Sequence, residues 1–305
     1  MGVRVKSTSL NYHDIFTRNG MPGIKISMPM ICGLDVAGEI EEIGANVSGW
    51  KIGERVLIDP RNRVEGGLVG ETIHGGLAEY CRVKEHQLVR IPDGVSFDQA
   101  SSLPVAYGTA HRMMMTIGQV TSDDKILILG ASGGVGTGAL LLAKMAGAEV
   151  VVCASSNSKM EKLKSLGADH AMTYMNNEFH KGVYELYGKP GRRGFEGGVT
   201  MVVNFTGGDT WVPSLRSLKR GGKLLTCGAT AGFDPKTDIR FIWTFELKLL
   251  GSNSWERDDL EQLMKYIRDG KMEPVIDKKL PLSETREGIR LLEEREVFGK
   301  VVINP

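Results

Sequence analysis

The sequence predicts an α/β protein that combines a doubly wound parallel sheet with a second domain of short β-strands. Two features of the chain support this fold class. Between residues 126 and 156 the chain reads as a strand, a glycine-rich turn, a helix and a second strand, and strands and helices go on alternating beyond it. Between about residues 36 and 95 it is rich in Gly, Val and alternating apolar positions, which is typical of a compact barrel.

The glycine-rich turn follows an apolar strand, residues 126–129, that suits a parallel sheet buried on both faces. Ala131, Gly133 and Gly136 stand where the pattern G-x-G-x-x-G has its glycines, so that backbone can approach a pyrophosphate. The helix that begins there offers unpaired N–H groups and the positive end of its dipole to phosphates. The predicted dinucleotide contacts are Gly130, Ala131, Ser132, Gly133, Gly134, Val135 and Gly136.

The second strand of this unit, residues 149–153, indicates which dinucleotide is bound. An acidic residue at its end would hold the ribose 2′-hydroxyl of NADH, but Ala154, Ser155 and Ser156 occupy that place, with Lys159 just beyond. Two hydroxyls and an ammonium can bind a 2′-phosphate, so the sequence favours NADPH over NADH. The alternative for Ser156 and Lys159 is a helix cap followed by a solvated lysine.

Further elements follow in the expected alternation. One helix ends at residues 162–166, a strand covers 200–204, a helix 211–218 and another strand 223–227. Residues 259–269 and 284–295 are predicted helices, and 299–303 a final strand. The apolar run 241–251 is a plausible strand through which two copies pair, with a buried helix or loop as the alternative.

Composition limits the classes of function. The chain of 305 residues, 41% hydrophobic and 25% charged, suits two globular domains, and a net charge of +1 gives no case for nucleic acid or an anionic membrane. The basic pair Arg192 and Arg193 lies between glycines, as in a solvated surface loop. No signal peptide is evident, and the four cysteines stand singly, so we expect a cytoplasmic protein without a disulfide or zinc framework.

Several motifs together resemble one known superfamily. They are GLDVAGEIEEIG at 33–44, GGLAEYCRV at 75–83, LPVAYGTAHRMM at 103–114, GASGGVG at 130–136 and the closing FGKVVINP. The chain resembles the medium-chain dehydrogenase/reductases, and within them the zinc-independent branch of quinone oxidoreductases and enoyl reductases. The resemblance implies a GroES-like barrel from residues 1–105 and 255–305, a Rossmann domain at 106–254, and an active site in the cleft between them.

Two departures from the superfamily pattern stand out. Where zinc-type relatives carry the catalytic metal ligands, this chain has Asn11, Leu34 and Pro104, and the four-cysteine structural lobe is missing between Asp59 and Gly76. We therefore expect no zinc, which makes alcohol oxidation a residual possibility. Relatives also usually begin with two further strands before the equivalent of residues 3–6, so the barrel is expected to be N-terminally shortened. Either the sequence given starts late, or the barrel has an open edge that a partner covers or that stays exposed, and we expect lower stability than in a full-length relative.

Hydride transfer to an electron-poor carbon then remains possible, because the substrate carbonyl itself stores the developing charge. The resemblance places Asn11, His13 and Asp14 beside the nicotinamide. Asn11 could donate to an enolate oxygen and His13 could supply a proton, although His13 could equally be a packed histidine. Phe16 replaces a tyrosine that quinone reductases often carry, so a proton from solvent is another option.

Other cofactor contacts follow from the resemblance and from positions at the carboxyl ends of predicted strands. Lys300 stands where a basic residue reaches the pyrophosphate, with an ordinary surface lysine as the alternative. Tyr174 would help to hold the adenosine phosphate, or would merely pack. The complete additional set is Tyr107, Thr109, Tyr174, Thr206, Gly207, Gly228, Ala229, Thr230, Asn253 and Lys300.

Two hypotheses of function remain. The first is an NADPH-dependent reductase of quinones, enones or enoyl thioesters, which acts on a small electrophile and forms a homodimer through the Rossmann domain. The second is a non-catalytic NADPH-binding sensor or structural protein. Turnover distinguishes them, because only the first consumes NADPH when an electrophile is added.

Overall fold

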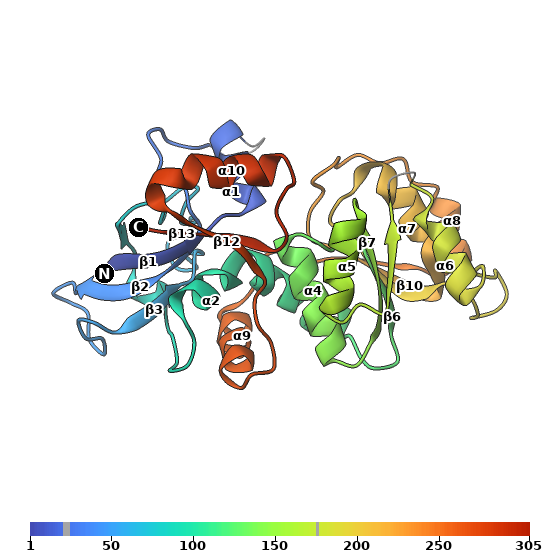
Figure 1. Ribbon diagram of the computed structural model, residues 1–305, viewed down its shortest axis with the longest axis horizontal. Helices are drawn as coiled ribbons and strands as arrows, with labels where there is room; N and C mark the ends of the chain where they lie inside the picture. Colours follow the sequence, from blue (N-terminus) through green and yellow to red (C-terminus); the bar gives the residue numbers. More distant parts are fainter. Residues whose placement is uncertain (21–24, 175–176) are drawn as a thin grey trace. The chain divides into compact units, whose positions relative to one another are not determined.

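The computed structural model describes residues 1–20, 25–174 and 177–305, and the chain forms two compact units (Figure 1). The first, the barrel unit, comprises Met1–Gly108 and Trp255–Pro305, and the second, the nucleotide unit, comprises Thr109–Ser254. The predicted α/β class is confirmed, because one unit is built on a largely antiparallel sheet and the other on a parallel sheet flanked by helices.

The sheet of the barrel unit is antiparallel except for one pair of strands. Its described strands are β1 Gly2–Ser9, β2 Asp35–Glu42, β3 Arg55–Ile58, β4 Tyr80–Arg82, β5 Leu88–Arg90, β12 Ile276–Pro281 and β13 Lys300–Asn304. They are ordered β12-β13-β1-β2-β3-β5, β4 also pairs with β1, and only β12 and β13 run parallel. Strand β1 pairs with β2 on one edge and with β13 and β4 on the other, so the two ends of the chain share this sheet.

Helices cover the barrel sheet. They are α1 Tyr12–Asn19, α2 Phe97–Ser101, α9 Arg257–Arg268 and α10 Thr285–Glu293, with short turns η1 Glu85–Gln87 and η5 Leu282–Glu284 and a π-helical segment η2 Leu103–Gly108. Helix α9 buries Leu260, Leu263, Met264 and Ile267, which recur at the helical period. Helices α1 and α10 lie side by side, joined by an ion pair between Arg18 and Glu293 (Figure 1).

The nucleotide unit contains a six-stranded parallel sheet in the order β11-β10-β9-β6-β7-β8. The strands are β6 Lys125–Ile128, β7 Glu149–Ala154, β8 His170–Thr173, β9 Val199–Val203, β10 Leu218–Thr226 and β11 Lys248–Gly251. The chain starts at β6 in the middle, winds outward through β7 and β8, and returns to β9 on the other side. The strand order therefore reverses between β6 and β9, which is where open α/β sheets bind ligands.

Helices lie on both faces of this sheet, with α4 and α5 on one face and α6 and α7 on the other (Figure 1). Their bounds are α4 Gly134–Met145, α5 Asn157–Ser165, α6 Phe179–Tyr187, α7 Trp211–Ser217 and α8 Ile239–Thr244; α3 Thr109–His111, the π-helical η3 Arg112–Gly118 and the short η4 Gly208–Thr210 complete the unit. Across the described residues, no helix is long and apolar enough to span a membrane.

The apolar run 241–251, predicted as a strand with a buried helix or loop as the alternative, divides between a helix and a strand. Its first part belongs to α8, and only Lys248–Gly251 forms a strand, β11 at the edge of the sheet. Helix α8 begins there because the side chain of Asp238 accepts a hydrogen bond from the backbone N–H of Arg240. The local cap therefore overrides the strand propensity of the aromatic residues that follow.

Candidate active site

The glycine-rich turn leads from β6 into α4 with the close packing that its sequence predicts. Gly130 has φ +62°, in the left-handed region that favours glycine. A Cβ at Gly136 would lie 2.4 Å from the carbonyl oxygen of Gly130 and 2.6 Å from Cα of Ala131. Helix α4 can thus begin directly against the turn, with its first N–H groups unused by the helix. This is the arrangement that accepts a phosphate.

Two further turns meet the glycine-rich turn at the carboxyl ends of the strands. A Cβ at Gly130 would lie 3.1 Å from the ring of Phe205 and 3.5 Å from Oγ1 of Thr206, both of which follow β9. The backbone N–H of Thr230, after β10, donates to the carbonyl of Phe205 at 3.2 Å. The structure therefore brings together the turns after β6, β9 and β10, including Gly207, Gly228 and Ala229.

Asn204 holds the turn after β9, and sequence reasoning missed it. Its buried side-chain oxygen accepts from the N–H groups of Thr206 and Gly207, both at 2.9 Å, while its amide nitrogen donates to Thr210 and Ser214. The motif MVVNF contains this residue at the end of a strand, which is the signal that could have found it. Asn204 therefore fixes the positions of two predicted cofactor contacts.

The end of β7 carries no acidic side chain. Ser155 and Ser156 are exposed there, and Oγ of Ser156 accepts a hydrogen bond from the backbone N–H of Lys159 at 3.3 Å. Ser156 therefore caps α5, and its hydroxyl lies at the strand end. Tyr174, beyond β8, is partly buried against the hydrophobic core. The contacts of both residues with the cofactor stay predictions.

Two other predicted cofactor contacts lie on different elements. Asn253 is exposed after β11, where the N–H of the preceding Ser252 donates to the carbonyl oxygen of Thr226 at the end of β10 at 2.8 Å, and Thr109 is nearly buried at the start of α3. Tyr107 is fully buried in the barrel unit, where its hydroxyl accepts a hydrogen bond from the backbone N–H of Val275 at 2.8 Å. The hydroxyl of Tyr107 thus helps to fix the chain before β12, and its contact with the cofactor stays a prediction.

Lys300 is also placed differently from the prediction. Its side chain is 2% exposed, and its ammonium donates to Leu10 O at 2.9 Å, Asn11 Oδ1 at 2.5 Å and Asp35 Oδ2 at 3.2 Å. Burial lowers the pKa of Lys300, and Asp35 counteracts this effect. Three partners inside the barrel unit engage the ammonium, and the alternative of an ordinary surface lysine is wrong because the side chain is buried. The contact of Lys300 with the pyrophosphate stays a prediction.

Asn11 and Asp14 belong to the same buried network. The amide nitrogen of Asn11 donates to Asp35 Oδ2 at 2.8 Å, and the carboxylate of Asp14 accepts from the N–H groups of Asn11 and Gly33. Burial raises the pKa of Asp14 to about 6, although the two backbone hydrogen bonds oppose this rise. Both side chains hold the chain around the start of α1, and their polar atoms face protein partners.

His13 is the one predicted catalytic side chain that is partly exposed. Its Nε2 lies 2.5 Å from Oε2 of Glu71, and the two side chains are 26% and 11% exposed. Glu71 lies in the loop before β4 and was not predicted, because no local pattern joins two residues that are 58 positions apart. The two side chains can share a proton between Nε2 of the imidazole and Oε2 of the carboxylate.

The residues at the catalytic zinc positions do not fit a zinc ion. Leu34 and Pro104 are buried side chains without a donor atom, and the amide of Asn11 is engaged by Asp35 and Lys300. Within the described part of the chain, no group of three His, Cys, Asp or Glu residues could hold a metal ion.

Comparison with known families matches both units. Residues 1–93 match the alcohol dehydrogenase GroES-like domain, and residues 134–269 match the domain described as zinc-binding dehydrogenase. The solved structure of an NAD-dependent alcohol dehydrogenase superposes on the chain with a TM-score of 0.90 at 31% identity, covering 100% of this chain and 91% of that one.

Two curated relatives are reductases. An acryloyl-coenzyme A reductase of Sulfurisphaera tokodaii is 29% identical over 99% of this chain and 91% of its own length. A chloroplastic NADPH-dependent alkenal/one oxidoreductase of Arabidopsis thaliana is 31% identical over 99% of this chain and 71% of its own length. The chain belongs to the medium-chain dehydrogenase/reductase superfamily, in the branch of enoyl and quinone reductases.

Proposed function

We propose that this protein is an NADPH-dependent reductase that transfers hydride to an activated carbon–carbon double bond or a quinone without zinc. The observation that carries the proposal is the meeting of three strand-end turns around the start of α4, in a chain where Leu34 and Pro104 leave two of the three catalytic zinc positions without a ligand atom. The printed activities of the two reductase relatives support the same reaction class.

The cofactor would be held by backbone more than by side chains. The N–H groups at the start of α4 would bind the pyrophosphate, and the turns containing Thr206 and Thr230 would line the path toward the nicotinamide. Ser155, Ser156 and Lys159 would receive the 2′-phosphate, since no carboxylate at the end of β7 repels it. When bound, NADPH supplies the hydride.

The barrel unit would supply the proton and the polar surroundings. His13 is the candidate proton donor, with its imidazole held through Nε2 by Glu71. Asn11 and Asp14 would hold the backbone at the start of α1, from which His13 projects. They do so within the buried network that includes Asp35 and Lys300. We assign them as positioning residues rather than as groups that touch the substrate.

Pairing through the edge of the parallel sheet is the assembly that we propose. Strand β11 presents an unpaired edge among the described residues, and apolar side chains are exposed beside it, with Leu249 39% and Trp243 69% accessible. Two copies joined along β11 would cover both features. We also propose a cytoplasmic location, because all four cysteines are free thiols, as in a reducing compartment.

The test of the function is optical measurement of NADPH oxidation with a quinone, a small enone and an enoyl-CoA thioester. NADH replaces NADPH in one control, and a chelator or added zinc is present in another. Chelator-resistant turnover with at least one electrophile supports the reductase and names its substrate class. Tight NADPH binding without turnover on any member of the panel overturns it in favour of a non-catalytic NADPH-binding protein.

A further inference from the structure

A second concave site lies on the nucleotide unit, away from the glycine-rich turn. It is a groove of about 460 Å³ between α6, α7, α8 and the loop 188–197, and we refer to it as the basic groove. The loop leads into the beginning of β9, whereas the cofactor turns follow the ends of parallel strands. The loop of the basic groove therefore lies at the amino ends of the parallel strands, whereas the candidate nucleotide site lies at their carboxyl ends.

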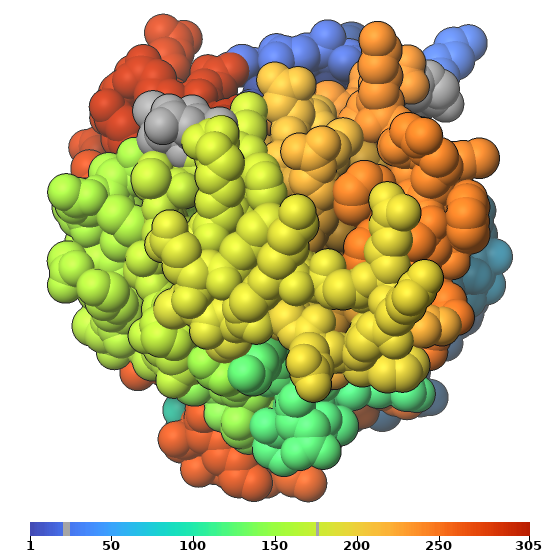
Figure 2. Space-filling model, turned by 90° about the vertical axis from the view of Figure 1, so that its right-hand side faces the viewer, coloured from blue at the N-terminus to red at the C-terminus, as the bar shows by residue number. Residues whose placement is uncertain are grey.

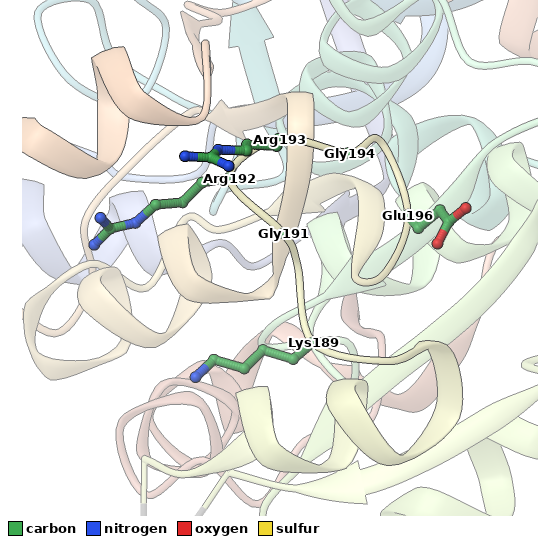
Figure 3. Close-up of a pocket in the computed structure, with 6 residues that line it drawn as sticks. All are labelled: Lys189, Gly191, Arg192, Arg193, Gly194 and Glu196. Carbon is green, nitrogen blue, oxygen red and sulfur yellow. The ribbon is translucent and has the colours of Figure 1, made fainter.

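Cationic side chains line the groove. Lys189 and Arg192 come from the loop and Arg216 from α7, and Arg193 lines the adjoining hollow. None of these four forms an ion pair with another described residue, whereas Lys181, Arg220 and Arg240 of the same unit each pair with a carboxylate. Figure 3 shows Lys189, Arg192 and Arg193 extending to one side of the loop, while Glu196 extends to the other. The loop therefore presents positive charge that the protein leaves uncompensated.

The floor of the groove is apolar and aromatic. Leu215 and Leu218 are buried beneath it. Phe241 of α8 and Phe245, the residue that follows this helix, stack with ring centroids 5.6 Å apart and planes 11° apart. The guanidinium carbon of Arg216 lies 6.0 Å from the centre of the Phe241 ring. In Figure 2 the yellow residues around the loop lie next to the orange segment that contains α8. Charge and ring surface thus adjoin one another.

One wall of the groove contains an unsatisfied polar atom. Nδ1 of His180, on α6, is buried and has no hydrogen-bond partner among the described residues. Burial lowers the pKa of His180, and the positive charges of Arg216 and Lys181 lower it further. The neighbouring Tyr184 is held in place by its hydroxyl, which donates to the carbonyl oxygen of Arg216 at 3.1 Å. A buried polar atom without a partner is unusual and fits a ligand atom.

We propose that the basic groove binds a small organic anion, a phosphate or carboxylate carried on a flat ring. Lys189, Arg192 and Arg216 would bind the charged head, and the ring would lie against the Phe241 and Phe245 side chains. A volume of about 460 Å³ lies in the range of small-molecule sites. The site is separate from the proposed reaction, so its ligand would act as a regulator or as a second ligand of the enzyme.

The test is isothermal titration calorimetry of the full chain in saturating NADP⁺, which keeps adenine nucleotides out of the cofactor site. The probes are AMP and benzoate, each a charged head on a ring, compared with adenosine, which lacks the charge, and inorganic phosphate, which lacks the ring. We expect AMP or benzoate to bind, with adenosine and phosphate at least about tenfold weaker. Which of the two binds distinguishes a phosphate ligand from a carboxylate ligand.

Substitutions locate the binding. Arg216→Ala and Arg192→Ala should each lower the affinity for the bound probe by about tenfold or more. Lys164→Ala, which changes an exposed lysine on α5, should leave this affinity unchanged. Arg192 lies on an exposed loop, so its substitution tests the site even if Arg216→Ala does not fold. The proposal is overturned if neither ring-bearing anion binds, if both arginine variants bind normally, or if inorganic phosphate binds as tightly as AMP.

Discussion

Nε2 of His13 lies 2.5 Å from Oε2 of Glu71, although 58 positions of sequence separate the two residues. The contact joins the start of α1 to the loop before β4 and gives a partly exposed imidazole a carboxylate partner. The hydrogen bond between the two side chains fixes the orientation of the imidazole ring. Under the proposed function, Glu71 would therefore position His13 as the candidate proton donor.

Glu71→Ala is expected to lower kcat by about tenfold while leaving the KM for NADPH within about twofold. The physical reason is that the imidazole of His13 loses the carboxylate that fixes its orientation. The measurement is steady-state NADPH oxidation with a saturating electrophile. Glu79→Ala, an exposed glutamate of the same unit, is the matched control. An unchanged kcat in Glu71→Ala would show that the contact has no role in proton supply.

Ser156→Asp should weaken NADPH binding while leaving the fold intact. Aspartate is as good a helix cap as serine, so α5 keeps its N-cap, but the new carboxylate repels a 2′-phosphate. We expect the KM for NADPH to rise by about tenfold and that for NADH to stay within about twofold. Ser156→Asn keeps the cap without the charge and serves as the control. Equal effects of the two substitutions on NADPH would place the 2′-phosphate elsewhere.

Asp14 should make stability depend on pH in a defined window. Its pKa is about 6 in the folded protein against 3.8 for the unperturbed group. Because the pKa of Asp14 is raised in the folded protein, the protonated carboxyl contributes to the free energy of unfolding. This contribution is fully present below about pH 4 and is lost as pH rises through about 6. The difference corresponds to about 3 kcal/mol of unfolding free energy.

Urea denaturation of the wild type and Asp14→Asn between pH 4 and 8 measures this contribution. We expect the variant to lack the part of the decline that falls between pH 4 and 6, although its overall stability is lower because one backbone donor loses its carboxylate acceptor. Asp93→Asn, an exposed residue of the same unit, is the control. Parallel pH curves for wild type and Asp14→Asn would contradict the assignment.

Lys300→Met is expected to destabilise the barrel unit by about 3–5 kcal/mol, because it leaves Asp35 as a buried charge without its cation. Lys279→Met provides a matched comparison, since Lys279 pairs with Asp98 at 2.6 Å but is 58% exposed, and it should cost less than about 1 kcal/mol. Chemical denaturation gives both values. A Lys300→Met variant that keeps its stability but loses NADPH affinity would instead return Lys300 to the role of a pyrophosphate ligand.

Local patterns predicted much of the fold. The strand, turn and helix at 125–145 follow from an apolar run, glycines at fixed spacing and a helix-forming segment, all of which act over a few residues. Their limit is visible at 241–251, where the first part of the run belongs to helix α8 and only Lys248–Gly251 forms a strand. The cap at Asp238 lies outside the run, so the apolar pattern within the run does not contain this signal for a helix.

The sequence by itself determined the superfamily, the parallel sheet with its phosphate-binding turn, and the loss of donor atoms at the zinc positions, because each depends on residue type at short spacing. Only the tertiary structure decided which polar side chains are available for chemistry. It buried Lys300 with Asp35 and Asn11 and brought Glu71 to His13. Burial and long-range pairing depend on how strands β1, β2 and β13 come together, and no local pattern contains that information.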